Sequence, residues 1–132
     1  MDSAIQHDLP VQSEMVQLLM DIGYVATGRG FQSQANDIFN GIIAARPNSE
    51  LPLIGLAVNK LNFGNFVEAA KILSERALVI NPDNGTAKCF LAMAVRSLGG
   101  NTEAQQLLEE VANNDTDAVS QELAKGLLQQ RS

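Results

Sequence analysis

Apolar side chains recur every three or four residues along most of the chain, which is the spacing of one face of an α-helix. The first such segment places Met15, Leu18, Leu19, Ile22 and Val25 at this spacing. Further segments show the same period and are separated by short stretches rich in Gly, Pro, Asn and Asp. The pattern predicts helices over residues 12–27, 32–45, 50–62, 66–80, 85–98, 102–113 and 117–130.

A longer period overlies the helical one: a glycine is followed five residues later by a small alanine. This pair occurs three times, at Gly30 and Ala35, Gly64 and Ala69, and Gly99 and Ala104. Successive glycines are 34 and then 35 residues apart. A period of 34 residues is the signature of the tetratricopeptide repeat, in which each repeat is a pair of antiparallel helices.

Each repeated position has a physical reason. Glycine ends the first helix of a pair because it enters the left-handed conformation at little cost. The small alanine allows the two helices to cross closely. Pro47 and Pro82 follow the second helix, since proline cannot continue a helix, and Thr116 stands at the equivalent place in the third unit. The two prolines lie 17 and 18 residues after their glycines, so the second unit holds one extra residue.

These elements predict an all-α fold in which three tetratricopeptide-like helix pairs stack into a right-handed α-solenoid. A last amphipathic helix would close the open end as a capping helix. The predicted organisation is a flexible tail over 1–11 and a repeat domain over 12–132, with repeats at about 16–49, 50–84 and 85–116 and the capping helix at about 117–130.

In stacked helix pairs the first helix of each pair lines the concave side. Counting each repeat from Val16, Glu50 and Gly85, the second, fifth, ninth and twelfth positions face this groove. They are Gln17, Met20, Tyr24 and Thr27, then Leu51, Ile54, Val58 and Leu61, and then Thr86, Cys89, Met93 and Arg96. The candidate partner-binding residues are Met20, Tyr24, Leu51, Ile54, Val58, Leu61, Cys89, Met93 and Arg96.

The predicted groove is apolar at its centre, whereas peptide-carboxylate clamps of this fold carry Lys, Arg and Asn at these positions. Contiguous exposed apolar surface usually marks a partner site, and methionines adapt to a ligand. The groove therefore predicts an amphipathic helix as partner, with apolar anchors at i, i+3 or i+4, and i+7. Two alternatives remain open: packing of the same residues between neighbouring helices, and self-association into a homodimer.

Charge and composition exclude several classes of partner. The net charge is −6 and the nine basic residues are scattered, which argues against nucleic acid and anionic membrane surfaces. The chain has no apolar run long enough to span a membrane, and Met1 to Pro10 do not form a secretory signal, so a cytoplasmic location is expected. One cysteine and one histidine are too few for an internal disulfide or a Cys/His zinc site.

No catalytic or cofactor motif is complete. Gly28-Arg29-Gly30 follows a helix, and Ser33 stands where a dinucleotide loop needs its third glycine. The polar run 113–117 lacks the spacing, glycine and closing glutamate of a calcium loop. Cys89 has no histidine in the repeats to act as its base. We therefore expect no enzymatic activity, no cofactor and no metal.

Several short runs carry a more specific resemblance. The run from Ile22 to Gly30, IGYVATGRG, leads into Ala35 and Phe39, and the runs RPNS (46–49) and LPLIGLA (51–57) follow. From Leu18 to Ala104 the chain resembles the small tetratricopeptide chaperones of bacterial type III secretion, specifically the group that holds the needle subunit.

The resemblance implies a concrete function. In that group the concave face holds the amphipathic C-terminal helix of the needle protein and keeps it monomeric in the bacterial cytoplasm, and a small helical co-chaperone usually completes the complex. Carried onto this sequence, the contacts are Met20, Tyr24, Leu51, Ile54, Val58, Leu61, Cys89 and Met93. Three alternatives stay open: a chaperone of the membrane-inserting translocator proteins, a general protein-interaction scaffold, and a structural homodimer.

Overall fold

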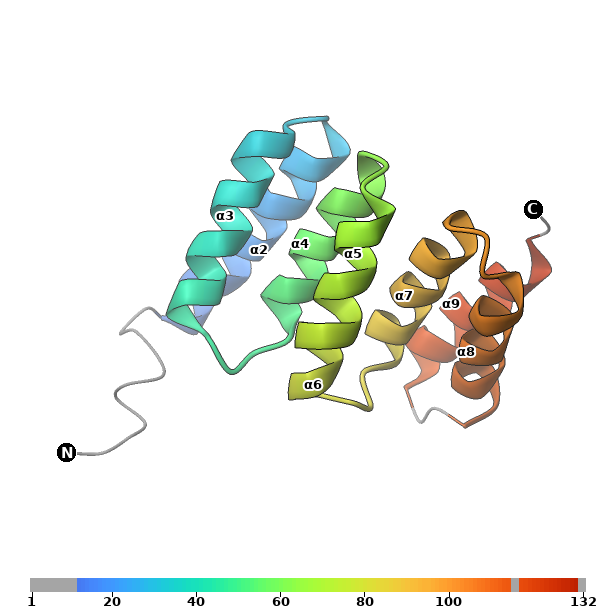
Figure 1. The fold of residues 1–132 in the computed structure, drawn as a ribbon. Helices are drawn as coiled ribbons and strands as arrows, with labels where there is room; N and C mark the ends of the chain where they lie inside the picture. The colour runs from blue at the N-terminus through green and yellow to red at the C-terminus, as the bar shows by residue number, and fades with distance from the viewer. Residues whose placement is uncertain (1–11, 115–116, 131–132) are drawn as a thin grey trace.

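The computed structural model describes residues 12–114 and 117–130, so the predicted tail over 1–11 and the position of Thr116 lie outside the described residues. The helices are α2 (Ser13–Gly28), α3 (Gln32–Ala45), α4 (Leu51–Asn62), α5 (Phe66–Ile72), the π-helix η1 (Leu73–Ala77), α6 (Leu78–Ile80), α7 (Gly85–Ser97), α8 (Asn101–Asn114) and α9 (Ala118–Gln129). No strand occurs within these residues. The predicted all-α fold is confirmed, and α5, η1 and α6 together form one continuous helical rod (Figure 1).

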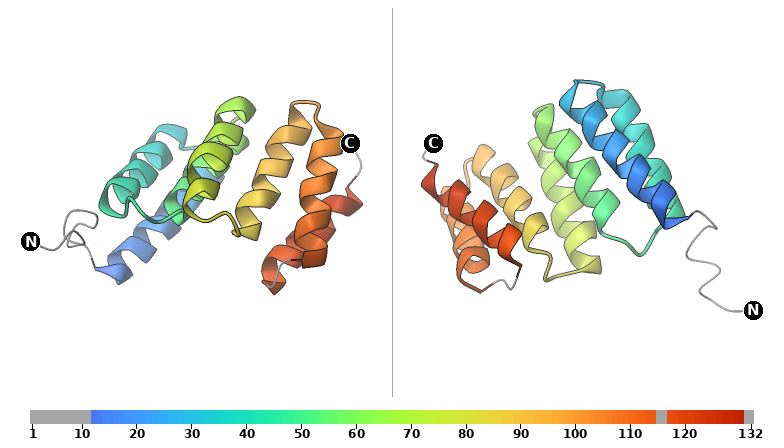
Figure 2. Two further views of the ribbon diagram at one scale, coloured as in Figure 1. Left: turned by 60° about the horizontal axis from the view of Figure 1, so that its bottom comes forward. Right: turned by 180° about the vertical axis from the view of Figure 1, so that it is seen from behind.

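The helices form two layers. In one layer α2, α4, α7 and α9 contact one another in that order, and in the other lie α3, the rod α5–η1–α6, and α8. Seen from behind, the molecule presents the α2, α4, α7 and α9 layer to the viewer (Figure 2, right). This layer corresponds to the predicted concave side, and α9 takes the place that the first helix of a fourth repeat would occupy.

The three repeat glycines end their helices as predicted. Gly30, Gly64 and Gly99 have φ angles of 84°, 79° and 96°, and no other described residue has a positive φ. In each case the N–H of the residue after the glycine donates to the carbonyl five residues earlier, for example Phe31 N to Ala26 O at 2.9 Å. This is the Schellman arrangement, which satisfies the last carbonyls of a helix. The same turn therefore reverses the chain in every repeat.

The extra residue of the second repeat is absorbed by the π-helix. The buried positions of the rod are Ala69, Leu73 and Ala77, with the last one eight residues after the first. In α3 and α8 the corresponding distance is seven residues, from Ala35 to Ile42 and from Ala104 to Val111. A single π-helical turn holds one more residue than an α-helical turn, so it keeps all three side chains on the buried face.

Phe39 fixes how the first repeat packs on the second. Its side chain is fully buried and extends from α3 to both α2 and α4. A Cβ atom on Gly23 would lie 2.7 Å from Phe39 Cζ, and one on Gly55 would lie 2.3 Å from Phe39 Cε1. The ring also meets Tyr24 edge-on, with centroids 5.2 Å apart and planes at 70°. Two helices can therefore approach Phe39 only because each presents a glycine.

We expect Gly55→Ala to destabilise the protein by roughly 1–3 kcal/mol, because the new methyl group overlaps the Phe39 ring in a packed core. Gly41→Ala is the matched control, since nothing lies within 4 Å of a Cβ atom at this position on α3. That substitution should stabilise the helix by about 0.5–1 kcal/mol. Urea unfolding followed by circular dichroism measures both changes in stability. Equal effects of the two substitutions would mean that the Phe39 ring does not restrict the size of the side chain at Gly55.

Deletion of the exposed Glu75 should convert η1 to regular α-helix and leave the protein folded, because it restores the seven-residue spacing of the other repeats. Deletion of the exposed Gln105 from α8 should cost far more stability, since it rotates the buried residues that follow it out of the core. Thermal unfolding of the two deletion variants compares them. A larger loss for the Glu75 deletion would mean that the π-helix has another cause.

Candidate functional site

An open pocket of about 490 Å³ lies on the α2, α4, α7 and α9 layer. Its lining comes from the middle of α2, the first turn of α4, the turn before α7 with the start of α7, and the start of α9. The lining residues are Gln17, Met20, Tyr24, Leu51, Ile54, Asp83, Asn84, Gly85, Thr86, Asp117 and Ser120. Helices α4, α7 and α9 thus all begin at the pocket.

Six of the predicted groove-facing residues line this pocket, and four of them, Met20, Tyr24, Leu51 and Ile54, form its apolar part. Leu51 is 54% exposed and Tyr24 38% exposed, and Met20 is half-buried. Ile54 is only 5% exposed and belongs to the core, so it forms floor rather than a free anchor point. Partial burial raises the pKa of Tyr24, so its hydroxyl remains protonated at neutral pH and can donate a hydrogen bond. A partner side chain therefore meets Met20, Tyr24 and Leu51 first.

The other two predicted groove residues of α4, Val58 and Leu61, lie nearer the C-terminal end of the helix. Val58 and Leu61 are half-buried and pack against the core of the second repeat, with Leu53, Ala57 and Leu73 among its members. Neither lines the pocket. These two positions follow the alternative in which predicted groove residues pack between neighbouring helices. The accessible apolar part of the groove is therefore shorter than the sequence predicts.

Three of the predicted groove residues of the third repeat contact α9 or the cluster beneath it, and the prediction of Cys89 as an accessible groove residue is wrong. Cys89 is fully buried, with Sγ 3.8 Å from the Ser120 carbonyl, and Arg96 Nη2 donates to the Leu127 carbonyl at 3.2 Å. Met93 is half-buried and packs against the cluster formed between α7, α8 and α9. The reason is positional: α9 lies where the next repeat would put its first helix.

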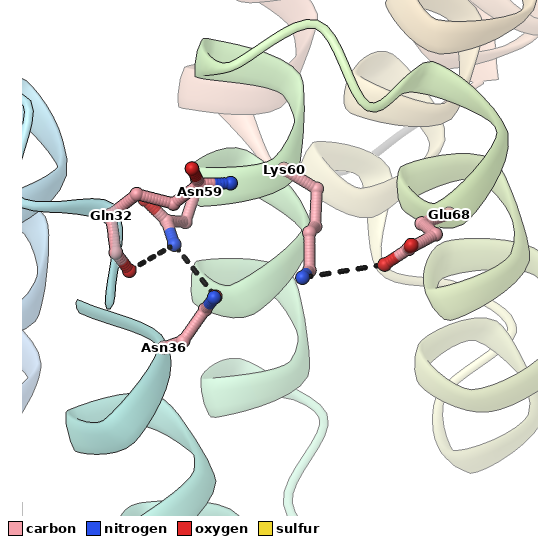
Figure 3. A network of polar contacts seen from close by, with 5 residues as sticks. All are labelled: Gln32, Asn36, Asn59, Lys60 and Glu68. Carbon is pink, nitrogen blue, oxygen red and sulfur yellow. Dashed lines mark hydrogen bonds and ion pairs between the residues drawn. The ribbon is translucent and has the colours of Figure 1, made fainter. Parts of the chain in front are cut away.

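Thr27, predicted to face the groove, belongs to a buried polar network instead. Its Oγ1 lies 3.2 Å from Asn59 Oδ1, and both residues are almost fully buried. Asn59 Nδ2 donates to Asn36 Oδ1 at 2.7 Å and to the Gln32 carbonyl at 3.1 Å, which joins α4 to α3 (Figure 3).

The next residue of α4 makes contact on a different side of the helix. Lys60 reaches Glu68 on α5 at 3.3 Å, away from Asn59 and its partners (Figure 3). Polar contacts therefore join α4 both to the first repeat and to the second helix of its own repeat. Sequence reasoning missed Asn59, which periodicity alone does not distinguish from a surface residue.

The polar edge of the pocket consists of residues that begin helices. Asn84 Oδ1 accepts from Ala87 N at 2.9 Å, and Asp117 Oδ1 accepts from Val119 N at 3.2 Å, as N-cap residues do. Asp117 Oδ2 also accepts from Ser120 Oγ at 2.7 Å, and these hydrogen bonds lower the pKa of Asp117. Asp117 is therefore ionised in neutral solution.

Glu50 joins this edge through its hydrogen bonds. Its Oε2 accepts from Asn81 Nδ2 at 2.7 Å and from Asn84 Nδ2 at 2.9 Å. Burial raises the pKa of Glu50, but the hydrogen bonds from Asn84 and Asn81 outweigh burial and the net pKa is lowered. The bonds tie the turn before α4 to the turn before α7, which fixes one side of the pocket.

The repeat positions predict the residues of the apolar part of the pocket but not Asp83, Asp117 and Ser120. A signal for this edge was present in the repeat itself. Glu50, Asn84 and Asp117 directly precede α4, α7 and α9, and they are 34 and 33 residues apart. A polar residue at the same place in each repeat marks one edge of the groove.

A second apolar surface lies on the outer face of α2. Met15, Leu18, Ile22 and Val25 are 49%, 52%, 44% and 56% exposed, although their spacing predicts a helix with a face to bury. The buried positions of α2 are instead the small residues Gly23, Ala26 and Thr27. We call these four exposed residues the α2 stripe. It lies at the end of the solenoid opposite α9 (Figure 1).

Within the described part of the chain, no group of three His, Cys, Asp or Glu side chains could hold a metal ion. Among the same residues, no helix combines the length and the hydropathy that crossing a membrane requires.

The fold is shared with solved structures of low sequence identity. It is similar to the type III secretion translocator chaperone SycD of Yersinia enterocolitica, with 16% identity, a TM-score of 0.74 and coverage of 89% of this chain and 90% of that one. The chain therefore has the fold of tetratricopeptide-repeat proteins. PcrH of Pseudomonas aeruginosa is similar too, with 16% identity, a TM-score of 0.74 and coverage of 95% and 96%.

A third similar structure comes from a different setting. The first tetratricopeptide domain of Spaghetti (RPAP3), bound to the HSP90 peptide SRMEEVD, matches with 19% identity, a TM-score of 0.71 and coverage of 89% and 90%. No known family profile matches the chain, and no curated protein does. The similarity therefore establishes the fold and not the partner.

Cys89 is the only cysteine of the chain and reports whether α9 stays in place. We expect its reaction with a thiol reagent such as DTNB to be slower by a factor of about ten or more in the folded chain than in urea. Ala124→Asp should accelerate the reaction, because Ala124 is buried in the cluster beside Cys89. Lys125→Asp on the exposed side of α9 is the control. Rapid reaction of the unsubstituted folded chain would mean that α9 does not cover the third repeat.

Proposed function

We propose that this chain is a cytoplasmic chaperone of bacterial type III secretion, which binds a segment of a translocator protein in the pocket between α2, α4, α7 and α9. The observation that carries the proposal is the open pocket with Met20, Tyr24 and Leu51 accessible at its surface. Apolar surface that is concave and partly accessible suits a large side chain of a partner.

The extent of the apolar surface supports a short segment over a long helix. A helix bound through anchors at i, i+3 or i+4, and i+7 needs a continuous stripe along the groove. Here α9 packs against Cys89 and Arg96 of the third repeat, and the half-buried Val58 and Leu61 pack against the core and do not line the pocket. The accessible part therefore accommodates one or two anchor side chains.

Two of the similar structures contain a bound partner segment, and they support a translocator segment as the partner of this chain. One is SycD in complex with a peptide of the translocator YopD, with a TM-score of 0.70 and 16% identity. The other is PcrH in complex with the chaperone-binding region of PopB, with a TM-score of 0.73 and 15% identity. Both proteins cover at least 90% of this chain. A translocator segment is therefore the first partner to test.

A needle subunit, with a small helical co-chaperone, is the second candidate. The runs IGYVATGRG and LPLIGLA favour it, because the sequence resemblance to the needle-subunit chaperones rests on them. In that case the amphipathic C-terminal helix of the needle protein would occupy the pocket, and polymerisation of the needle protein would be prevented.

A homodimer is favoured by one observation, the α2 stripe. Its residues are spaced by three, four and three positions, which is the a/d spacing of a two-helix seam. A dimer formed there would leave the pocket open, unlike the groove-mediated dimer that the sequence leaves possible. The net charge of −6 on each copy opposes such a pairing at low ionic strength.

Leu51→Asp should weaken binding of a co-expressed translocator or needle subunit by about ten- to hundredfold. The apolar side chain that the partner places in the pocket would lose the apolar surface of Leu51 that it contacts. The residue is 54% exposed, so the free chain should stay folded. Val67→Asp on α5 is the matched control, since Val67 has the same exposed fraction of 54% outside the pocket. Affinity is measured by calorimetry and helicity by circular dichroism.

Failure of every co-expressed candidate to form a soluble complex would overturn the chaperone proposal. A complex that Val67→Asp weakens as much as Leu51→Asp would move the binding surface away from the pocket. A free dimer that Ile22→Asp dissociates, with no heterocomplex detected by light scattering, would establish self-association instead.

A further inference from the structure

We propose that α9 is a displaceable helix: it leaves α7 while the repeats stay folded, and an amphipathic helix of the partner then takes its place. The inference rests on the proposed function and deepens it, because it states how the groove holds a longer segment than the closed pocket admits. It assigns an interaction surface to the side of α7 on which α9 lies. We call this surface, formed by Cys89, Met93 and Arg96, the α7 face.

The helix α9 lies on α7 as a partner helix would lie in a groove. Its buried residues are Ser120, Ala124 and Leu127, at positions i, i+4 and i+7. An amphipathic helix bound in an apolar groove presents its anchors at the same spacing. Cys89 is fully buried in the cluster that Ala124 and Leu127 join, and Met93 packs half-buried against that cluster. A segment of this chain therefore occupies the third-repeat part of the groove.

Polar contacts at both ends of the α7 face fix the direction of the helix that lies on it. The hydroxyls of Thr86 and Ser120 lie 3.1 Å apart near the start of α9. Near its end, Arg96 Nη2 donates to the Leu127 carbonyl at 3.2 Å, and a cation there is favourable for the negative end of the helix dipole. The acceptor is a backbone carbonyl, so any helix that runs in the direction of α9 can keep this hydrogen bond.

The contacts that hold α9 in place are few for a helix of its length. Of its three buried residues only Leu127 is large, while Leu123 and Leu128 are half-buried. Gly126 is exposed, and nothing lies within 4 Å of a Cβ atom at this position, so packing does not require a glycine that weakens the helix. An isolated helix of 12 residues is marginal in water. We therefore expect α9 to lose its helical structure when it leaves α7.

The repeats retain their cores without α9. On its other side α7 contributes Ala87, Leu91 and Ala94 to a cluster that includes Leu53 of α4. Among residues 12–114 and 117–130, α9 supplies no member of this cluster or of the cluster around Phe39. Departure of α9 therefore disrupts one of three clusters, and this local opening costs less free energy than global unfolding.

Opening would change which segments the groove can hold. With α9 in place, Asp117 and Ser120 form one wall of the pocket. Without α9 this wall is absent, and the groove continues from Leu51 and the rest of the pocket onto the α7 face. A tethered helix acts at high effective concentration, so α9 competes with the partner for the α7 face. This competition lowers the affinity for a long helix and favours its release.

The reaction of Cys89 with DTNB in the full chain measures how often the α7 face is open. Gly126→Ala and Gly41→Ala are a matched pair, since each glycine is exposed within a helix and has nothing within 4 Å of its Cβ position. Gly126→Ala should slow the reaction about two- to fivefold, because it stabilises only the closed state of α9. Gly41→Ala, on α3, should leave the rate unchanged.

A second measurement supplies α9 from outside. The chain with Ala124→Asp has its own α9 detached, and circular dichroism checks that it stays helical. Tethered α9 acts at about millimolar effective concentration and protects Cys89 about tenfold or more, so a peptide of residues 117–130 at about 1 mM should restore roughly tenfold protection. The peptide with Leu127→Asp should not protect, because Leu127 is buried. The peptide with Lys125→Asp should protect, because Lys125 is exposed.

Three results would overturn the inference. Equal slowing by Gly126→Ala and Gly41→Ala would mean that only global unfolding exposes Cys89. Slowing by neither would mean that DTNB reaches Cys89 without any movement of α9. Failure of the peptide of residues 117–130 to protect would mean that the α7 face does not take a helix from outside. Each of these leaves the proposed function standing, since no partner protein is present in either measurement.

Discussion

The fold depends on Phe39, which fills the space between the first and second repeats. The ring is fully buried and is met by Gly23 from α2 and by Gly55 from α4. Because a methyl group at either glycine would overlap the ring, the distance between α2 and α4 is set by this one side chain. The same ring contacts Tyr24, so the packing of the core also positions a residue of the pocket.

The groove is a consequence of how the repeats end and begin. Each first helix stops at a glycine with positive φ, and each following first helix begins behind a polar residue at Glu50, Asn84 or Asp117. Stacking then brings the starts of α4, α7 and α9 to one edge of the concave layer. Helix caps, which the chain needs for folding, therefore also supply the polar side of the pocket. The apolar side comes from α2 and α4, whose inner residues are held by Phe39 and Asn59.

Much of the fold follows from spacing in the sequence. The glycines at positions 30, 64 and 99 and the alanines that follow them predict the helix ends and the close crossings, because glycine and alanine have few other reasons to recur at this period. The extra residue before Pro82 is visible in the sequence too. The sequence does not show that a π-helix absorbs this residue, since the π-helix depends on which side chains the neighbouring helices bury.

The candidate site was only partly predictable. Met20, Tyr24 and Leu51 follow from their repeat positions, but Cys89, at the position equivalent to Met20, is covered by α9. Repeat position specifies which way a side chain points and not which helix lies over it. The α2 stripe shows the reverse case, because its regular apolar spacing predicts burial and the structure leaves it exposed.

Methyl NMR of the chain with a co-expressed, purified partner segment shows whether that segment binds in the pocket. The pocket and the α2 stripe each contain one methionine, one leucine and one isoleucine, so they can be compared residue type by residue type. We expect large shifts for the methyl groups of Met20, Leu51 and Ile54, with little change for those of Met15, Leu18 and Ile22. Shifts confined to the α2 stripe would contradict this expectation and would place the partner on the outer face of α2.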